Sequence, residues 1–320
     1  MMLRRPALAT ASVLALLLPG VSAAQESPRL TSPTEQSTLE ERFGGLSGDS
    51  AFGAYQRGYY KTALELARER AEAGDVHAQI LAAELLSRGL GVRRDVEEAA
   101  RLYEAAALQG DPEATFRFAL MLLDGVGVER DRDRAYEMME EAAEAGHPLA
   151  QFNHAQIILE RQPSFEGEER AIGYFRTAAE AGVADAQYAM AQVHLEGLGG
   201  TAADEAEARR WLEMAARRNH DTAQLDLATM MVSGRGGEVD FEAGFAWMKR
   251  AAEMGNVAAR NRLAKLYRSG IGVEGDTVQA AAWYLLARQA GLFDPEMEDL
   301  LYGLDEDQIA EARERAGTLR

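Results

Sequence analysis

Apolar residues recur at helical spacing along most of the chain, in segments that end at glycine. One segment reads Leu263-Ala264-Lys265-Leu266-Tyr267, and the same order of small and large apolar positions returns at Phe118, Met190 and Leu227. Spacings of three and four residues place such side chains on one face of an α-helix. The pattern predicts an all-α chain, and we call this recurring element helix A.

The helix A pattern repeats with a nearly constant period. The alanine-rich stretches end at Gly74, Gly110, Gly146, Gly182, Asn219, Gly255 and Gly291, with successive spacings of 36, 36, 36, 37, 36 and 36 residues. An alanine stands four residues after each of the first six boundaries, at Ala78, Ala114, Ala150, Ala186, Ala223 and Ala259. A fixed period of this length is typical of helical repeat proteins, in which each unit packs against its neighbours.

Glycines and aspartates mark the helix ends within each unit. Glycine ends a helix without steric cost, and pairs follow helix A at Gly89/Gly91, Gly125/Gly127, Gly197/Gly199, Gly234/Gly236 and Gly270/Gly272. Fifteen residues before a boundary stand Asp95, Asp131, Asp204, Asp240 and Asp276. We expect each to cap a second helix, helix B, which stabilises that helix by about 1 kcal/mol. Helix B carries a small residue, two bulky ones and an alanine pair, as in Ala208, Trp211-Leu212 and Ala215-Ala216.

This combination of period, glycine turn and helix B pattern resembles the Sel1-like repeat family, a branch of the tetratricopeptide superfamily. The resemblance covers about Asp49 to Gly291 and is best at Ala259 to Gly291, where Trp283-Tyr284 stand at the family's positions. It implies a right-handed α-α superhelical solenoid of about seven helix-turn-helix repeats, the first of them degenerate. Residues 292–320 are expected to close the array with a capping helix over 304–319, whose apolar side is Ile309, Ala312 and Ala316.

Two units depart from the pattern. The third has Glu160 to Gly167 in place of the glycine turn and no aspartate at the cap position. Its loop is expected to differ in shape, either as a tolerated irregularity or as a contact for a partner. The fourth unit is one residue longer and ends in Asn219, a residue that tolerates the left-handed conformation.

Residues 1–23 have the three parts of a secretory signal peptide. Arg4 and Arg5 precede an apolar stretch, and small residues precede a cleavage site after Ala23 or Ala24. The apolar stretch is short for a bilayer-spanning helix, which disfavours an uncleaved anchor. Residues 24–48 are polar and are predicted to form a disordered tether. We therefore expect a periplasmic or secreted bacterial protein, with no integral membrane segment after signal cleavage.

Composition narrows the functions further. The chain has no cysteine, which excludes disulfides, thiolate nucleophiles and sulfur-ligated zinc. The formal net charge is −18, and loss of Arg4 and Arg5 would make the exported chain more acidic still. Such a surface repels nucleic acid and favours cationic partners. The same charge has an alternative explanation, because it keeps an exported protein soluble.

No pattern of catalytic or metal-binding residues emerges from the sequence. The five histidines are His77, His147, His154, His194 and His220, and none belongs to a zinc-binding pair with a third ligand nearby. The glycine pairs lack the strand before and the lysine-serine pair after that a phosphate loop requires. We predict no catalytic residues, no metal site and no cofactor, and we do not expect an enzyme.

The resemblance implies that helix A residues line a concave face which binds other proteins. In the middle units this face comprises Phe116, Phe152 and Tyr188, accompanied by Gln156, Gln192, Glu160 and Glu196. An aromatic residue at this position has an alternative role in packing within its repeat. We predict a protein–protein interaction scaffold or regulator, with a membrane sensor kinase or an envelope or polysaccharide assembly complex as its partner.

A different class of function is an envelope hydrolase or a protein that binds glycan or peptidoglycan. Sugar binding requires clustered exposed aromatic side chains, whereas Trp211, Trp247 and Trp283 recur at one core position of helix B. A hydrolase requires convergent titratable groups, and the repeat pattern itself explains those present. The interaction scaffold is therefore the preferred interpretation.

Overall fold

The computed structural model describes residues 51–319, and all regular structure in that range is helical. The predicted signal peptide (1–23) and tether (24–48) lie outside the described residues. Helices α3 to α18 follow one another in repeating pairs, which confirms the prediction of an all-α repeat solenoid. The chain divides into two compact units between Pro163 and Ser164, which we call the N-terminal unit and the C-terminal unit.

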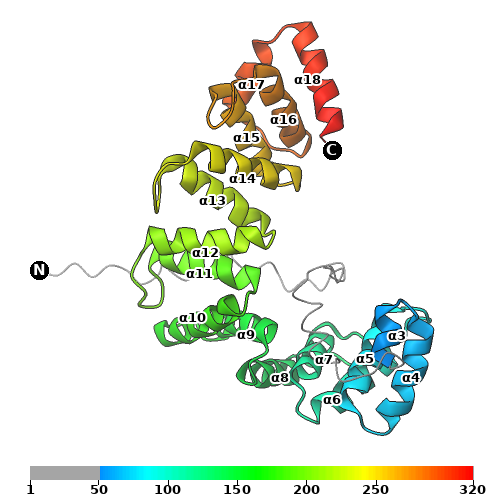
Figure 1. Cartoon of the computed structure of the whole chain (residues 1–320). Helices are drawn as coiled ribbons and strands as arrows, with labels where there is room; N and C mark the ends of the chain where they lie inside the picture. The colour runs from blue at the N-terminus through cyan, green and yellow to red at the C-terminus, as the bar shows by residue number, and fades with distance from the viewer. Residues whose placement is uncertain (1–50, 320) are drawn as a thin grey trace, which may run out of the picture. The chain divides into compact units, whose positions relative to one another are not determined.

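The N-terminal unit consists of helices in which each packs against the next along the chain (Figure 1). Their bounds are α3 Ala51–Gln56, α4 Tyr60–Glu72, α5 Val76–Arg88, α6 Val96–Ala107, α7 Pro112–Asp124, α8 Arg132–Glu144 and α9 Pro148–Arg161. Helices α5, α7 and α9 are helices A, and α4, α6 and α8 are helices B. Their facing sides bury a core that includes Leu85, Leu86, Tyr103, Phe118 and Leu122.

The C-terminal unit continues the alternation and ends in two additional helices. Its bounds are α10 Phe165–Glu180, α11 Ala184–Glu196, α12 Glu205–Arg217, α13 Asp221–Ser233, α14 Phe241–Glu253, α15 Val257–Ser269, α16 Thr277–Gln289, α17 Pro295–Tyr302 and α18 Glu306–Thr318. Helices A are α11, α13 and α15. Around α16 the core buries Leu263, Trp283, Tyr284 and Met297.

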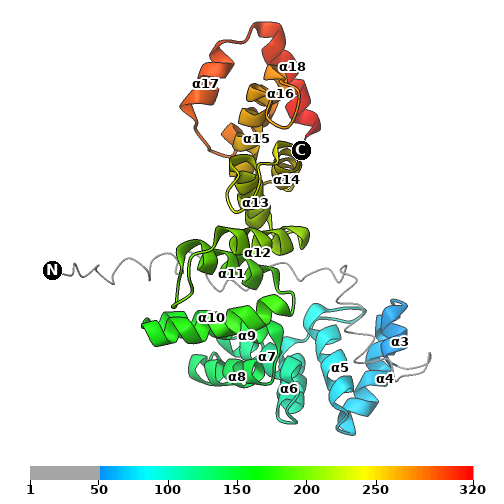
Figure 2. The ribbon, with the colours of Figure 1, turned by 60° about the vertical axis from the view of Figure 1, so that its left-hand side comes forward.

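The chain beyond Gly291 forms two helices where the sequence led us to expect one. Asp294 caps α17 and Pro295 takes its first position, where a proline lacks only an N–H that would be unbonded anyway. Helix α18 lies beside α16 (Figure 2). It buries Ala312 and Ala316 there, while Ile309 is half-buried.

The predicted aspartate caps are present in the structure. The side chain of each of the five aspartates accepts a hydrogen bond from a backbone N–H at the start of helix B: Asp95, Asp131, Asp204, Asp240 and Asp276. In the third repeat Ser164 takes this role and accepts from the N–H of Gly167 at 3.1 Å. The loop of that repeat also differs in shape, since the residue that follows α9 is Gln162, with φ of −129° and ψ of 64°, and not a left-handed glycine.

The two glycines of each turn meet different structural requirements. The first, such as Gly125, ends helix A in the left-handed conformation, as predicted. The second comes close to the preceding repeat: a Cβ at Gly127 would overlap the carbonyl oxygen of Val96, and one at Gly236 that of Glu205. The second glycine is thus required for repeats to approach one another. Asn219 replaces glycine with φ of 66°, as the sequence led us to expect.

A glutamine joins helix A to the helix B before it, a feature that we did not predict. The Nε2 atoms of Gln79, Gln151, Gln187 and Gln224 each donate to the carbonyl oxygen eight residues earlier, at 3.3, 3.3, 3.0 and 3.1 Å. Arg260 makes the same bond to Ala252 at 3.2 Å. Each of these carbonyls also accepts the N–H of the boundary residue three positions later, so the side chain adds a second hydrogen bond that ties helix A to the helix B before it.

Candidate protein-interaction face

The structure distributes the predicted binding residues over both units. Phe116, Phe152 and Gln156 belong to the N-terminal unit, whereas Tyr188, Gln192 and Glu196 belong to the C-terminal unit. Their accessibility also differs: Phe116 and Gln156 are buried, with 3% and 9% of their surface exposed. Phe152, Tyr188 and Gln192 are half-buried, and Glu160 and Glu196 are exposed. Whether any of them contacts a partner remains a prediction.

Phe116 is covered by a histidine from the next repeat. Its ring stacks on His147 with the ring centroids 4.6 Å apart and an angle of 24° between the planes. His147 is also the N-cap of α9, since its Nδ1 accepts from the N–H of Ala150 at 3.1 Å. The other nitrogen, Nε2, lies 3.0 Å from Oε2 of Glu113. This network assigns the hydrogen to Nε2, which donates to the carboxylate.

Glu113 is the electrostatic centre of this arrangement. Besides His147, it binds Arg117, whose Nε lies 2.7 Å from Oε1. Burial raises the pKa of Glu113, but the hydrogen bond with His147 and the ion pair with Arg117 outweigh burial and hold the pKa far below its usual range. The carboxylate is therefore charged and fully engaged within the protein.

The same arrangement recurs in the C-terminal unit with different residues. Tyr188 stacks on His220 at 4.6 Å and 21°, and Nδ1 of His220 caps α13 by accepting from Ala223 at 3.1 Å. Nε2 of His220 lies 3.4 Å from Oδ1 of Asp185. The sequence showed that His147 and His220 share a register, but it did not reveal that both cap a helix and cover an aromatic ring.

Tyr188 adds a hydrogen bond that Phe116 cannot make. Its hydroxyl donates to Oδ2 of Asp226 on α13 at 3.0 Å. Burial, reinforced by the charge of Asp226, raises the pKa of Tyr188. Burial also raises the pKa of Asp226, although the hydrogen bond from Tyr188 opposes it. Asp226 was not predicted, because its only signal in the sequence is a carboxylate at a helix A position that is otherwise mostly apolar or basic.

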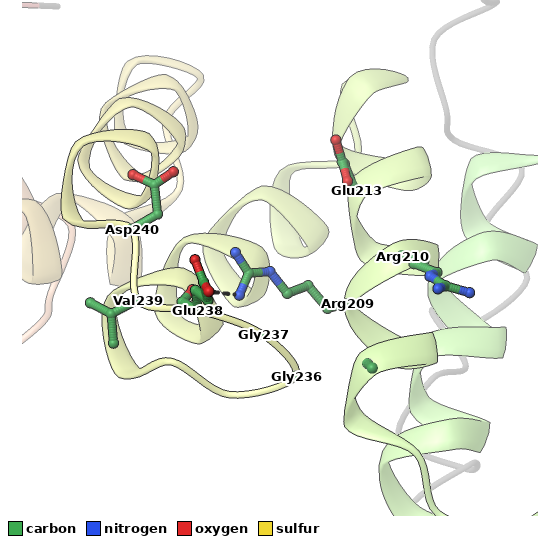
Figure 3. A pocket seen from close by; sticks show the side chains of 9 residues that line it. Arg209, Arg210, Glu213, Gly236, Gly237, Glu238, Val239 and Asp240 are labelled. Carbon is green, nitrogen blue, oxygen red and sulfur yellow. Dashed lines mark hydrogen bonds between the residues drawn. The ribbon is translucent and has the colours of Figure 1, made fainter.

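A surface pocket lies between α12 and the loop that joins α13 to α14 (Figure 3). Arg209 points toward this loop and donates from Nη1 to the carbonyl oxygen of Glu238 at 3.0 Å, whereas Arg210 points away from it. Glu213 and Asp240 add negative charge to the lining. The pocket therefore presents mixed charges and no nucleophile with an adjacent base.

Within residues 51–319, no group of three or more histidine, aspartate or glutamate side chains has a geometry that could hold a metal ion. Trp211 and Trp283 are buried in the core, and Trp247 is half-buried with Arg250 over its ring at 5.6 Å. None of the described helices has the length and apolar character needed to cross a bilayer.

Comparison with known proteins identifies the repeat. The family model described as Sel1 repeat matches six consecutive segments, at residues 76–111, 112–147, 148–183, 184–220, 222–256 and 257–292. The chain belongs to the Sel1 repeat family. These segments begin at or next to the start of helix A, and each ends one residue after a boundary found from the period, so the predicted resemblance is confirmed.

Solved structures agree with this assignment. A Sel1 repeat protein from Oxalobacter formigenes is 26% identical, with 76% of this chain and 97% of that chain covered and a TM-score of 0.63. A protective antigen of uropathogenic Escherichia coli that displays the same repeat fold is 25% identical, with coverage of 89% and 67% and a TM-score of 0.55. No curated protein sequence gives a significant match. Sel1 repeat proteins are generally interaction scaffolds and not enzymes.

Proposed function

We propose that this Sel1 repeat protein is an exported bacterial scaffold or regulator that binds partner proteins through its helices A. The partner is a membrane sensor kinase or a complex of envelope or polysaccharide assembly. Export rests on the signal peptide pattern of residues 1–23. A second candidate, an envelope hydrolase or glycan-binding protein, has no comparable support among the described residues.

The observation that carries the proposal is the set of contacts between neighbouring helices A. In the C-terminal unit Tyr188 reaches Asp226 on α13, and Arg262 on α15 donates to the hydroxyl of Thr229 on α13 at 2.6 Å. These contacts hold polar and aromatic side chains in fixed positions while Gln192 and Glu196 beside them keep solvent access. A surface whose side chains are already ordered loses less entropy on binding, which favours recognition of a protein.

The test is selective loss of partner capture. Envelope extracts are passed over the wild-type protein and over the Gln192→Arg/Glu196→Lys variant, with Glu180→Lys on α10 as the control for charge change. We expect the double variant alone to lose specific partners while keeping the thermal midpoint of the wild type. Equal capture by all three proteins would count against the proposal, and sedimentation of the protein with purified cell wall would favour the second candidate.

A further inference from the structure

The helices A of the C-terminal unit are sorted by charge. The charged side chains of α11 are Asp185 and Glu196, and those of α13 are Asp221 and Asp226, with no lysine or arginine in either helix. Helix α15 is the reverse, because it contains Arg260, Arg262, Lys265 and Arg268 and no acidic residue. Among the helices B of the same unit, α10, α12 and α14 each carry both signs, and α16 carries a single charge, Arg288. A charge excess that served solubility alone has no reason to separate by helix.

Ion pairs within the protein neutralise two of the four basic side chains of α15, Lys265 and Arg268. Lys265 binds Asp294 at 2.7 Å and Glu296 at 2.9 Å, and Arg268 also binds Glu296. Arg262 instead is exposed and donates to the uncharged hydroxyl of Thr229. A guanidinium has five N–H donors, so Arg262 has capacity for a carboxylate from outside the chain.

On α13 and α11, the carboxylates of Asp226 and Glu196 can accept hydrogen bonds from a cationic group of a partner. Asp226 accepts a hydrogen bond from Tyr188 and lies within the electrostatic reach of Arg262 on α15, and its carboxylate can accept several more hydrogen bonds. Glu196 is exposed at the end of α11, and Gln192 lies one turn before it. Half-burial of Asp226 strengthens its attraction for an incoming cation, because the local dielectric is lower than in water.

Side-chain contacts join the three helices α11, α13 and α15. The stack of Tyr188 on His220 and the hydrogen bond from Tyr188 to Asp226 join α11 to α13. The hydrogen bond from Arg262 to Thr229 joins α13 to α15. The acidic and basic parts therefore form one surface with a fixed order of charge, acidic over α11 and α13 and basic at Arg262.

We propose that this surface docks a charge-polarised segment of a partner protein, with its lysine or arginine residues over Glu196 and Asp226 and an acidic residue at Arg262. The inference rests on the proposed function, and it adds the chemistry and the direction of the partner segment. Complementary charge in this order selects a partner and its orientation, and it steers the encounter. A uniformly basic segment would be repelled at Arg262, which separates this partner from the generic cationic one that the net charge predicts.

The experiment selects binders from a random twelve-residue peptide library displayed on phage, with the purified wild-type protein as bait. We expect enriched peptides with lysine or arginine toward one end and aspartate or glutamate toward the other. Photo-crosslinking then maps where they bind. Failure to enrich any peptide, or enrichment without charge order at the α11–α13 face, would overturn the inference; in the second case the proposed function survives. Peptides that crosslink only to helices B would overturn both.

Variants test the charge order on the strongest selected peptide. Glu196→Lys with Asp226→Asn, and separately Arg262→Glu, should each weaken binding at least about tenfold, as close interfacial charge pairs do. A peptide whose acidic residue is changed to lysine should bind Arg262→Glu better than wild type, a rescue that a purely structural role of Arg262 would not produce. Glu180→Lys and Arg210→Glu, exposed changes on helices B, should bind as wild type does. Equal loss in these controls, or no rescue, would overturn the inference.

Discussion

His147 caps helix α9 with one ring nitrogen and binds Glu113 of the preceding repeat with the other, at 3.0 Å. A single side chain thus begins one helix A and fixes it to the helix A before it. His220 and Asp185 repeat the relationship in the C-terminal unit at 3.4 Å. His147 and His220 are therefore connectors between repeats.

Replacement of His147 tests this role. His147→Asn keeps a side chain that can accept from the N–H of Ala150, whereas His147→Ala leaves that N–H without its cap. Loss of the cap costs about 1 kcal/mol, and loss of a partner for the partly buried Glu113 adds about 1–3 kcal/mol. We expect urea unfolding to rank the proteins wild type, His147→Asn, His147→Ala. Equal stability of the two variants would show that the cap contributes nothing.

The low pKa of Glu113 predicts a pH dependence of stability. Because the pKa is lower in the folded protein than in the unfolded chain, the charged carboxylate stabilises the fold above the unfolded value of about 4.5. That contribution is lost as the pH falls below this value. Glu113→Gln should therefore flatten the decline in unfolding free energy between about pH 5 and pH 3. Glu137→Gln, an exposed change on α8, serves as the control, and parallel pH profiles for Glu113→Gln and wild type would refute the prediction.

Substitutions at Gly127 and Gly146 distinguish the cost of close approach between repeats from the cost of the left-handed backbone conformation. Both have positive φ, 70° and 86°, but a Cβ at Gly127 would overlap the carbonyl of Val96 while one at Gly146 would meet nothing within 4 Å. Gly146→Ala should cost about 1–2 kcal/mol from the left-handed backbone alone. Gly127→Ala should cost about 1–3 kcal/mol more, because the repeats must move apart. Similar losses, measured by chemical denaturation, would mean that the second glycine is conformational only.

The glutamine bond between repeats predicts a stabilising substitution. The second repeat has Thr115 where four of the other repeats have glutamine, and its hydroxyl donates to the backbone carbonyl of Asp111, the N-cap of its own helix, at 2.8 Å. Thr115→Gln would supply the missing bond to the carbonyl of Ala107, worth about 0.5–1.5 kcal/mol. Thr115→Leu is the control of similar size without a donor. A gain in thermal midpoint by both variants would assign the effect to burial.

Export gives a prediction about the mature chain. If residues 1–23 are a signal peptide, protein from the periplasm of the expressing bacterium should begin at Ala24 or Gln25. N-terminal sequencing after cell fractionation measures this directly. Full-length protein in the membrane fraction would indicate an uncleaved anchor instead of a signal peptide.

The sequence predicted the features that depend on nearby residues and those that recur in successive repeats. Period, glycine turns and aspartate caps such as Asp95 follow from propensities that act within a few residues, and all are present in the structure. Pro295 was less informative, because a proline both interrupts a helix and begins one; here it begins α17. The approach of Gly127 to Val96 depends on the neighbouring repeat, so no local pattern reveals it.

The candidate site was predictable in position but not in accessibility. The register that placed Phe116 and Tyr188 on helices A is correct, yet a histidine from the next repeat covers each ring. Phe116→Ala should cost about 3–5 kcal/mol by leaving a cavity, so loss of binding in that variant would report unfolding. Half-buried and exposed neighbours such as Gln192 and Glu196 are the better probes of binding.

We propose that helices A, and not helices B, contact the partner protein. Site-specific photo-crosslinking in living cells measures this, with a photoreactive amino acid at position 196 on α11 and, as the matched control, at position 180 on α10. We expect a discrete protein adduct from position 196 and none from position 180. Adducts of equal yield from both positions, or from position 180 alone, would contradict it.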